Sequence, residues 1–209
     1  MNILIAYESS GTVREAFRKM GHNAWSCDLQ DADDNSAHHL QMDAGSAIMG
    51  GCPYTNSTWR YICKWDLIIM HPPCTALCVS GNAHYGRNKP KHLRRLLAID
   101  YTIEMFELAK ANADAVCMEN PVGVLPIKAN QYVQPYEHGH DESKKTGLWL
   151  HNLPLITPTD TRTLPSCGYW DNQTPSGQNK LGPSANRWKI RSKTYQGIAD
   201  AMAQQWGQA

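Results

Sequence analysis

Short apolar runs of strand length recur along the first 150 residues, and helical patterns separate them. These runs cover residues 2–7, 22–27, 65–70, 115–118 and 147–150. An alternation of short strands and helices favours a parallel sheet that is covered by helices. We therefore predict an α/β fold with a doubly wound, mostly parallel sheet.

Three helices are predicted from the spacing of apolar side chains. In the first, Thr12 and Glu15 are spaced for a capping box and Gly21 is a plausible stop. Its expected buried stripe is Val13, Ala16, Phe17 and Met20. The longest candidate covers residues 91–113, with an expected apolar face of Leu93, Leu96, Leu97, Tyr101, Met105 and Leu108. A closing amphipathic helix is expected from Tyr195, Ile198, Met202 and Trp206.

Several stretches show no periodicity and are predicted to be irregular. Residues 31–34 are acidic and read as a solvated loop, and residues 75–90 read as a long loop with Gly and Pro. From 151 to 193 the composition shifts towards Pro, Gly, Ser, Thr and Asn. A chain of 209 residues suits one domain. We predict a single domain over 1–209 with an irregular segment at about 151–193.

The overall composition excludes several classes of protein. With 20 Lys and Arg against 19 Asp and Glu, bulk electrostatics does not favour coating nucleic acid, although local basic patches are compatible with it. No apolar run approaches the ~20 residues needed to cross a bilayer, and the start lacks the basic residues of a signal peptide. Seven irregularly spaced cysteines favour free thiols in a reducing cytoplasm. We therefore expect a cytoplasmic protein without a membrane partner.

Polar clusters stand at the ends of four predicted strands. They are Glu8–Gly11, Asp28, His71–Cys74 and Glu119–Pro121. Taken singly, each cluster is also explained as an ordinary turn, cap or strand terminator. Because ligands bind beyond the carboxyl ends of the strands in open parallel sheets, their coincidence predicts a functional site at that edge.

Cys74 and Glu119 carry the chemistry expected at this edge. Cys74 follows a Pro-Pro corner, which would hold its thiol at a fixed angle, although free cysteines are often simply buried. Glu119 adds a carboxylate that could equally be a turn cap. A thiol beside an acid suits nucleophilic addition to a ring, in which the acid protonates the nitrogen that gathers charge.

These motifs resemble the cytosine-C5 DNA methyltransferases. The resemblance is carried by the first strand with its glycine turn and by His71-Pro72-Pro73-Cys74-Thr75 and Glu119-Asn120-Pro121. It is closest to the short members often encoded by bacteriophages, and it covers about residues 1–150 and, more loosely, 191–206. It implies a class I, Rossmann-like fold that uses S-adenosyl-L-methionine, in the host cytoplasm if the gene belongs to a phage.

The resemblance implies methyl transfer to carbon 5 of a cytosine, in DNA or in a free cytosine nucleotide. Cys74 would attack carbon 6 and Glu119 would protonate N3, after which the enamine carbon takes the methyl group. The base must be flipped out of the duplex or single-stranded, with residues 75–90 as a closing loop. Where the family has an Arg-rich motif, this chain has Ser143 to Thr146. The implied catalytic residues are Cys74, Glu119, Asn120 and Lys145.

Cofactor binding is implied at the ends of the first strands. Asp28 would hold the ribose hydroxyls and Asp43 the adenine amine. The methionine part would lie among Tyr7, Glu8, Ser10 and Gly11, and Pro72 completes the candidate set. The first turn is poorer in glycine than the family's cofactor loop, and Thr75 replaces the usual glutamine.

Two basic stretches are candidates for phosphate contact, although solvated surface explains them equally well. The candidate nucleic-acid ligands are Arg87, Lys91, Arg94, Arg95, Arg187 and Arg191. The stretch between Leu150 and Arg187 is too short for the large domain that reads a DNA target.

Other functions remain as alternatives. A methyltransferase for exocyclic amines would need neither Cys74 nor Glu119, and a non-catalytic protein could retain only the cofactor and nucleic-acid binding. The zinc deaminase motif is out of order here. A zinc site can be drawn from Cys63, His71, Cys74 and Cys78, but it lacks paired Cys-x-x-Cys knuckles, so no metal is predicted.

Overall fold

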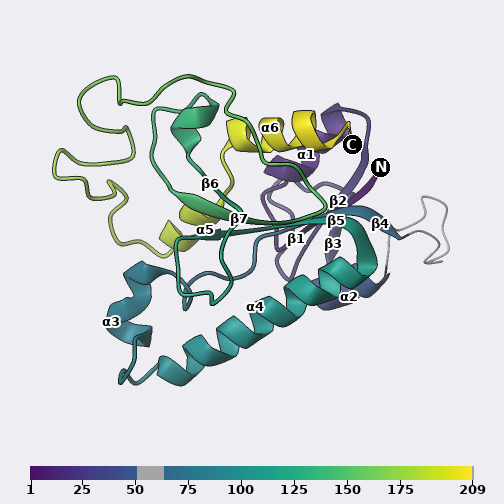
Figure 1. Cartoon of the computed structure of the whole chain (residues 1–209), viewed down its shortest axis with the longest axis horizontal. Coiled ribbons are helices and arrows are strands. Elements are labelled where there is room, and N and C mark those ends of the chain that lie inside the picture. The colour runs from purple at the N-terminus through teal and green to yellow at the C-terminus, as the bar shows by residue number, and fades with distance from the viewer. Residues whose placement is uncertain (51–63, 209) are drawn as a thin grey trace.

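The computed structural model describes residues 1–50 and 64–208, and seven strands of this part form one sheet (Figure 1). The strand order is β3-β2-β1-β4-β5-β7-β6. The strands are β1 (Asn2–Ala6), β2 (Asn23–Asp28), β3 (His39–Gln41), β4 (Trp65–Met70), β5 (Ala113–Pro121), β6 (Gln131–Val133) and β7 (Thr146–His151). Neighbours from β3 to β5 pair in parallel, whereas β7 is antiparallel to both β5 and β6.

Helices cover both faces of the sheet. They are α1 (Thr12–Lys19), α2 (Ala44–Gly50), α3 (Asn82–Tyr85), α4 (His92–Asn112), α5 (Arg187–Ser192) and α6 (Gln196–Trp206), with 3₁₀ turns η1 (Val79–Gly81) and η2 (Pro135–His138). Helices α1 and α6 pack together on one face, and α2 and α4 on the other (Figure 1). The predicted α/β fold with a mostly parallel sheet is confirmed, and the arrangement is compatible with a Rossmann-like fold.

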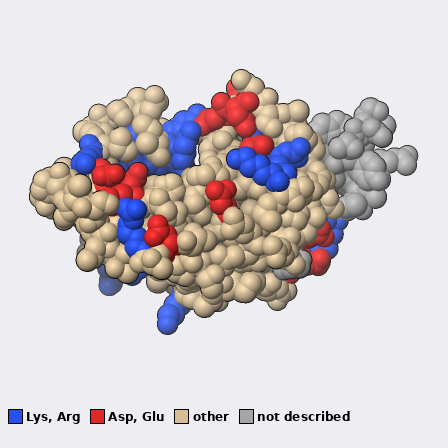
Figure 2. Space-filling model, turned by 90° about the horizontal axis from the view of Figure 1, so that it is seen from above, with Lys and Arg blue, Asp and Glu red and all other residues tan. Residues whose placement is uncertain are grey.

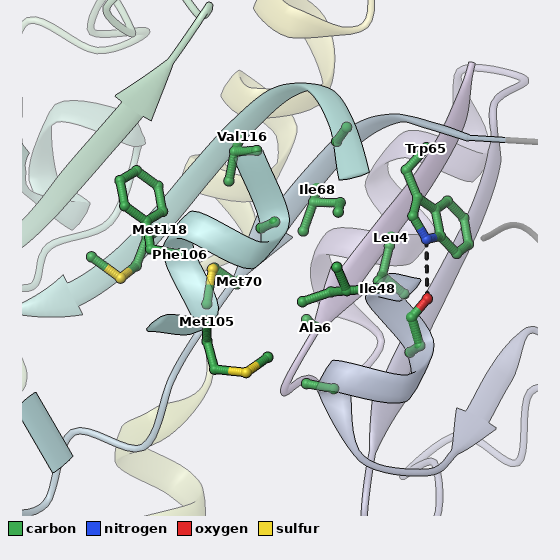
Figure 3. Close-up of a cluster of buried hydrophobic side chains, with 14 of the residues drawn as sticks. Leu4, Ala6, Ile48, Trp65, Ile68, Met70, Met105, Phe106, Val116 and Met118 are labelled. Atoms are coloured by element: carbon green, nitrogen blue, oxygen red, sulfur yellow. Dashed lines mark hydrogen bonds between the residues drawn. The ribbon is translucent and has the colours of Figure 1, made fainter. Parts of the chain in front are cut away.

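The core has two halves because successive side chains of a strand point to opposite faces of the sheet. Leu4, Ile68 and Val116 belong to the cluster on the side of α2 and α4 (Figure 3). Within it, the Trp65 indole donates a hydrogen bond to the carbonyl of Ala47 at 3.1 Å, which ties β4 to α2. A second cluster, which includes Ile69 and Cys117, lies on the side of α1 and α6.

The buried face predicted for the long helix is wrong in its first half. Leu93 and Leu97 are 66% and 60% exposed, and Tyr101 is also exposed. This half of α4 extends away from the sheet toward α3, so only the second half, around Met105 and Phe106, reaches the core (Figure 1). In α1, Met20 is likewise exposed, contrary to the prediction.

Several short elements escaped prediction. Strands β3 and β6 have three residues each and α2 has seven, too few for a periodic pattern. Residues 75–90 contain η1 and α3 rather than one irregular loop. Strand β5 continues through Glu119 to Pro121, which were expected to stop it.

The last part of the chain follows the prediction more closely. Between the end of β7 and the start of α5 the chain is irregular, as expected. Helix α5 itself falls inside the segment predicted to be irregular, at about 151–193. Helix α6 buries Ile198, Met202 and Trp206 as predicted. No helix among the described residues has the length and apolar character required to cross a membrane.

Candidate active site

The polar clusters predicted to meet do lie along one edge of the sheet. Ala6 pairs with both Cys27 and Met70, and Met70 pairs with Met118. These are the last apolar positions of four adjacent parallel strands. Their successors therefore lie along the carboxyl edge in the order Asp28, Tyr7, His71 and Glu119.

Asn120 ties the Pro-Pro corner to β5. Its side chain is 1% exposed, and its amide nitrogen donates a hydrogen bond to the carbonyl of Pro72 at 3.0 Å. This bond fixes the loop that begins at the end of β4 against the strand that carries Glu119. Cys74 is held two residues beyond that carbonyl, at the same edge.

The Cys74 thiol is half-buried, and its surroundings favour the protonated form. Burial raises its pKa, and the nearby charge of Glu119 raises it further, followed by Cys78. Lys144 acts in the opposite direction. Because only a thiolate is a strong nucleophile, the thiol needs to lose its proton when a substrate binds.

Glu119 forms a hydrogen bond with His71, a partner that the sequence did not indicate. The His71 Nδ1 atom lies 3.0 Å from Glu119 Oε2, and the two side chains are only 11% and 12% exposed. Burial alone would raise the pKa of Glu119, but the hydrogen bond and charge of His71, assisted by Lys144 and Thr146, lower it. The pairing follows from the register of the sheet, because each residue directly follows one member of the Met70–Met118 pair, and the sequence alone does not give that register.

Lys144, rather than Lys145, is the cation whose charge acts on this site. The Lys145 side chain is exposed, and its ammonium group lies over the Tyr132 ring, 4.6 Å from the ring centre. Lys144 lowers the pKa of both Cys74 and Glu119. The role of Lys145 stays a prediction, and the motif from Ser143 to Thr146 did not indicate that Lys144 acts on these two groups.

The segment that follows Cys74 is held in place by its backbone. The amides of Leu77 and Cys78 both donate to the carbonyl of Cys74, which closes a helical turn. Leu77 is fully buried, and its carbonyl accepts a hydrogen bond from the amide of Val124 at 3.0 Å. A side chain on Gly123 would place its Cβ only 2.5 Å from that carbonyl, so this close approach requires glycine.

Arg95 holds the same segment from α4 and is not available to nucleic acid. It is 5% exposed, and its guanidinium donates to the carbonyl of Ala76 at 2.7 Å, the side chain of Asn82 at 2.8 Å and the carbonyl of Cys78 at 3.3 Å. Its prediction as a phosphate ligand is therefore wrong, because the side chain is buried and its guanidinium is hydrogen-bonded to three protein acceptors.

Glu8 caps α1, so the predicted capping box of Thr12 and Glu15 is wrong. The Glu8 carboxylate is buried and accepts hydrogen bonds from the amides of Val13 at 2.8 Å and Arg14 at 3.2 Å. Ser10 also donates to Glu8, at 3.3 Å. The first amides of α1 are thus occupied by a protein carboxylate and do not offer a site for the carboxylate of a ligand.

The rest of the first turn has a constrained backbone. Tyr7 has a φ of 63°, and its hydroxyl bonds to that of Tyr101 on α4 at 2.8 Å. Gly11 has a φ of 71°, and a Cβ there would overlap the guanidinium of Arg14. A positive φ is uncommon for residues with side chains. The backbone of the turn is therefore constrained, and the Tyr7–Tyr101 hydrogen bond joins it to α4.

The acidic candidates for cofactor binding differ in how far they are occupied. Asp28 is half-buried at the end of β2 and accepts one hydrogen bond, from the amide of Gln30 at 2.9 Å. Its position and remaining acceptor capacity fit a ribose diol. Asp43 is exposed and caps α2 through the amide of Ser46 at 2.9 Å, and the hydrogen bonds from Ser46 lower the pKa of Asp43. Pro72 is buried, and its carbonyl is bound to Asn120.

The remaining basic candidates are divided between two places. Arg87, Lys91 and Arg94 are exposed at α3 and the start of α4, and Arg191 is exposed on α5. Arg187 is half-buried and donates to the carbonyl of Leu181. On the face seen in Figure 2, basic side chains form small groups beside acidic ones, and most of the surface is uncharged.

Helix α5 is attached to the loop that follows β2. Asp33 accepts ion pairs from Lys189 at 2.6 Å and Lys193 at 2.9 Å. The carbonyl of Lys193 also accepts a hydrogen bond from Lys144 at 3.3 Å. The irregular segment therefore ends against the site edge, between the loop that follows Asp28 and the segment that precedes β7.

The cysteines and acids of the described chain form no metal site. No group of three or more His, Cys, Asp or Glu side chains is arranged to hold a metal ion in residues 1–50 and 64–208, and Cys63 of the alternative zinc site lies outside those residues.

No protein-family model and no curated protein matches the sequence. The function is therefore inferred from the geometry of this edge.

Proposed function

We propose that this protein transfers a methyl group from S-adenosyl-L-methionine to carbon 5 of cytosine in DNA. The observation that supports this best is the connection between the two reacting groups. Cys74 follows β4, Glu119 lies near the end of the adjacent strand β5, and the hydrogen bond from Asn120 to Pro72 fixes the chain after β4 to β5. A nucleophile and an acid held in this way suit addition to a planar ring.

The chemistry follows from what the two side chains can supply. The Cys74 thiol gives its proton to the Glu119 carboxylate when the substrate is bound. The Cys74 sulfur then adds to carbon 6, the ring electrons move toward N3, and N3 takes the proton that Glu119 now carries. Carbon 5 is then an enamine carbon and can accept a methyl group. Carbon 5 then loses its proton to solvent and the thiolate departs. N3 returns its proton to Glu119, which passes it back to Cys74, and the enzyme is regenerated.

S-adenosyl-L-methionine would supply the methyl group when it is bound. Asp28 fits the ribose hydroxyls by its position and remaining acceptor capacity. Because Glu8 already occupies the first amides of α1, the methionine carboxylate would be held by other groups of the first turn. In this proposal Glu8 acts by holding the start of α1.

DNA is the substrate that the exposed basic side chains favour. Arg87, Lys91 and Arg94 are grouped at the start of α4, next to the segment that follows Cys74. With so few contacts and a formal charge of +1, we expect modest and salt-sensitive affinity.

The proposal is tested by offering labelled S-adenosyl-L-methionine with duplex DNA, single-stranded DNA and dCMP in parallel. We expect label in DNA, and acid hydrolysis should recover it as 5-methylcytosine. Transfer to dCMP alone would retain the chemistry and replace the substrate. Cofactor binding without transfer to any of the three would identify a non-catalytic protein and overturn the proposal.

A further inference from the structure

The imidazole of His71 is placed against Glu119 by the register of the sheet. Ile69 and Cys117 are paired neighbours on β4 and β5, and both lie in the core cluster on the side of α1 and α6. His71 and Glu119 come two residues later in the chain. Because alternate residues of a strand point to the same face, both side chains lie on that side of the sheet. Their Nδ1 and Oε2 atoms are 3.0 Å apart, with about one-tenth of each side chain exposed.

The His71 ring makes few polar interactions in the described part of the fold apart from its hydrogen bond with Glu119. Its second ring nitrogen, Nε2, is buried and has no hydrogen-bond partner among the described residues. An unpaired buried polar atom costs free energy, so an apolar side chain would fill this position better if filling were its only role. The single hydrogen bond that the ring makes within residues 1–50 and 64–208 is the one to Glu119.

We propose that His71 is a positioning residue that orients Glu119 and stabilises its carboxylate after the proton has moved to the base. This inference rests on the proposed function. When the Glu119 O–H bond breaks and the N3–H bond forms, the carboxylate that remains accepts a hydrogen bond from Nδ1–H of His71. The pair thus makes proton donation more favourable, and His71 itself neither gains nor loses a proton in the step.

The other ionisable groups that face Glu119 come from three elements. Lys144, from the segment before β7, favours the carboxylate. Cys74, beyond β4, and Cys117, within β5, are thiols whose pKa is raised first by burial and then by the negative charge of Glu119. Lys144 therefore acts in the same direction as His71, and a variant of His71 should weaken the carboxylate's stabilisation without abolishing it.

The test compares His71→Asn with the wild-type protein. Asparagine keeps a donor near the position of Nδ1 but cannot carry a positive charge. We expect single-turnover methyl transfer to slow by about 10- to 100-fold, part of the ~10²–10⁴-fold that a general acid contributes. The acid limb of the pH–rate profile, where Glu119 and Cys74 both become protonated, should move to higher pH, because burial then raises the pKa of Glu119 with less opposition. His151→Asn, at the far end of β7, is the matched control and should change neither quantity.

A second measurement does not depend on catalysis. Carboxyl ¹³C spectra of the free protein should show Glu119 titrating at higher pH in His71→Asn than in wild type. If the wild type methylates nothing but this shift is seen, the proposed function fails and the pairing stands. An active His71→Asn variant with the wild-type rate and pH profile would overturn the role of His71.

A third measurement uses the intact ring in case the His71 variant does not fold. The ¹⁵N spectrum of wild-type His71 should show a proton on Nδ1, facing the Glu119 carboxylate. In Glu119→Gln the amide can donate to Nδ1, so Nδ1 should lose its proton. An unchanged His71 spectrum in Glu119→Gln would show that the two side chains do not share a proton and would overturn the inference.

Discussion

At the scale of single residues, the site depends on polar side chains that pair across adjacent strand ends. We predicted Cys74, Glu119 and Asp28 from their positions after apolar runs, because the end of such a run marks the end of a strand in the sequence. The partners of these residues were not predicted. The side of the sheet taken by His71, or the choice between Lys144 and Lys145, depends on register and on contacts from distant segments.

The hydrogen bond between Glu119 and His71 predicts both a rate and a pH dependence. Glu119→Gln should fold and lose ~10²–10⁴-fold of the methylation rate, because the amide cannot protonate N3. The folded protein lowers the pKa of Glu119 below its ordinary 4.5, so the carboxylate stabilises the fold above that pH. This stabilisation is lost as the pH falls through the lowered pKa. Thermal unfolding of both proteins at neutral and acid pH should therefore show the difference between them shrinking in acid.

Asp28 gives a separate prediction about the cofactor. Asp28→Ala should weaken S-adenosyl-L-methionine binding by ~1–3 kcal/mol, because two ribose hydroxyls lose their acceptor. Isothermal calorimetry measures this directly, with Asp31→Ala, in the exposed loop that follows, as the control. Equal affinities for Asp28→Ala and wild type would remove Asp28 from the cofactor site.

Among the helices and strands, periodic patterns predicted the positions of the long elements but not the interactions that cap their ends. The start of α1 illustrates the difference. The spacing of Thr12 and Glu15 is a local signal, whereas the cap is Glu8, which reaches the helix from the preceding turn. The same limitation applies to α4, whose exposed leucines follow a helical period although that half of the helix extends past the sheet.

The cap of α1 predicts a contrast between two substitutions. Glu8→Ala should lower the free energy of unfolding by about 1–2 kcal/mol, because two buried amides lose their acceptor. Thr12→Ala should change it far less, since no amide of α1 bonds to its side chain in the described structure. Urea unfolding measures both. A larger loss in Thr12→Ala than in Glu8→Ala would restore the capping box.

Helix α4 predicts different results for two neighbouring arginines. Arg94 is exposed, so Arg94→Glu should flatten the log–log dependence of DNA affinity on salt by about 0.7–0.9 per lost contact. Arg95→Met should leave that slope unchanged and loosen the segment after Cys74, which limited proteolysis would detect. The reverse pattern, with a flattened slope only in Arg95→Met, would contradict the burial of Arg95.

At the scale of the whole molecule, the sheet brings into one edge residues that are up to about 110 positions apart in the chain. The alternation of strands and helices predicted this arrangement, because parallel strands share the direction of their carboxyl ends. The antiparallel β6 and β7 and the attachment of α5 through Asp33 were not predictable in the same way. They depend on contacts between segments without periodicity, including the irregular chain from 152 to 186.

The central claim is that Cys74 forms a covalent bond with carbon 6 of cytosine, and trapping that bond tests it most directly. DNA containing 5-fluorocytosine cannot lose its carbon-5 substituent as a proton, so the adduct should persist in the presence of S-adenosyl-L-methionine. Intact-mass analysis should show protein joined to DNA in wild type, with peptide mapping to Cys74, and no adduct in Cys74→Ser. A control variant, Cys167→Ser, changes an exposed cysteine and should give the wild-type result. An adduct at Cys78, or undiminished methylation by Cys74→Ala, would contradict the account.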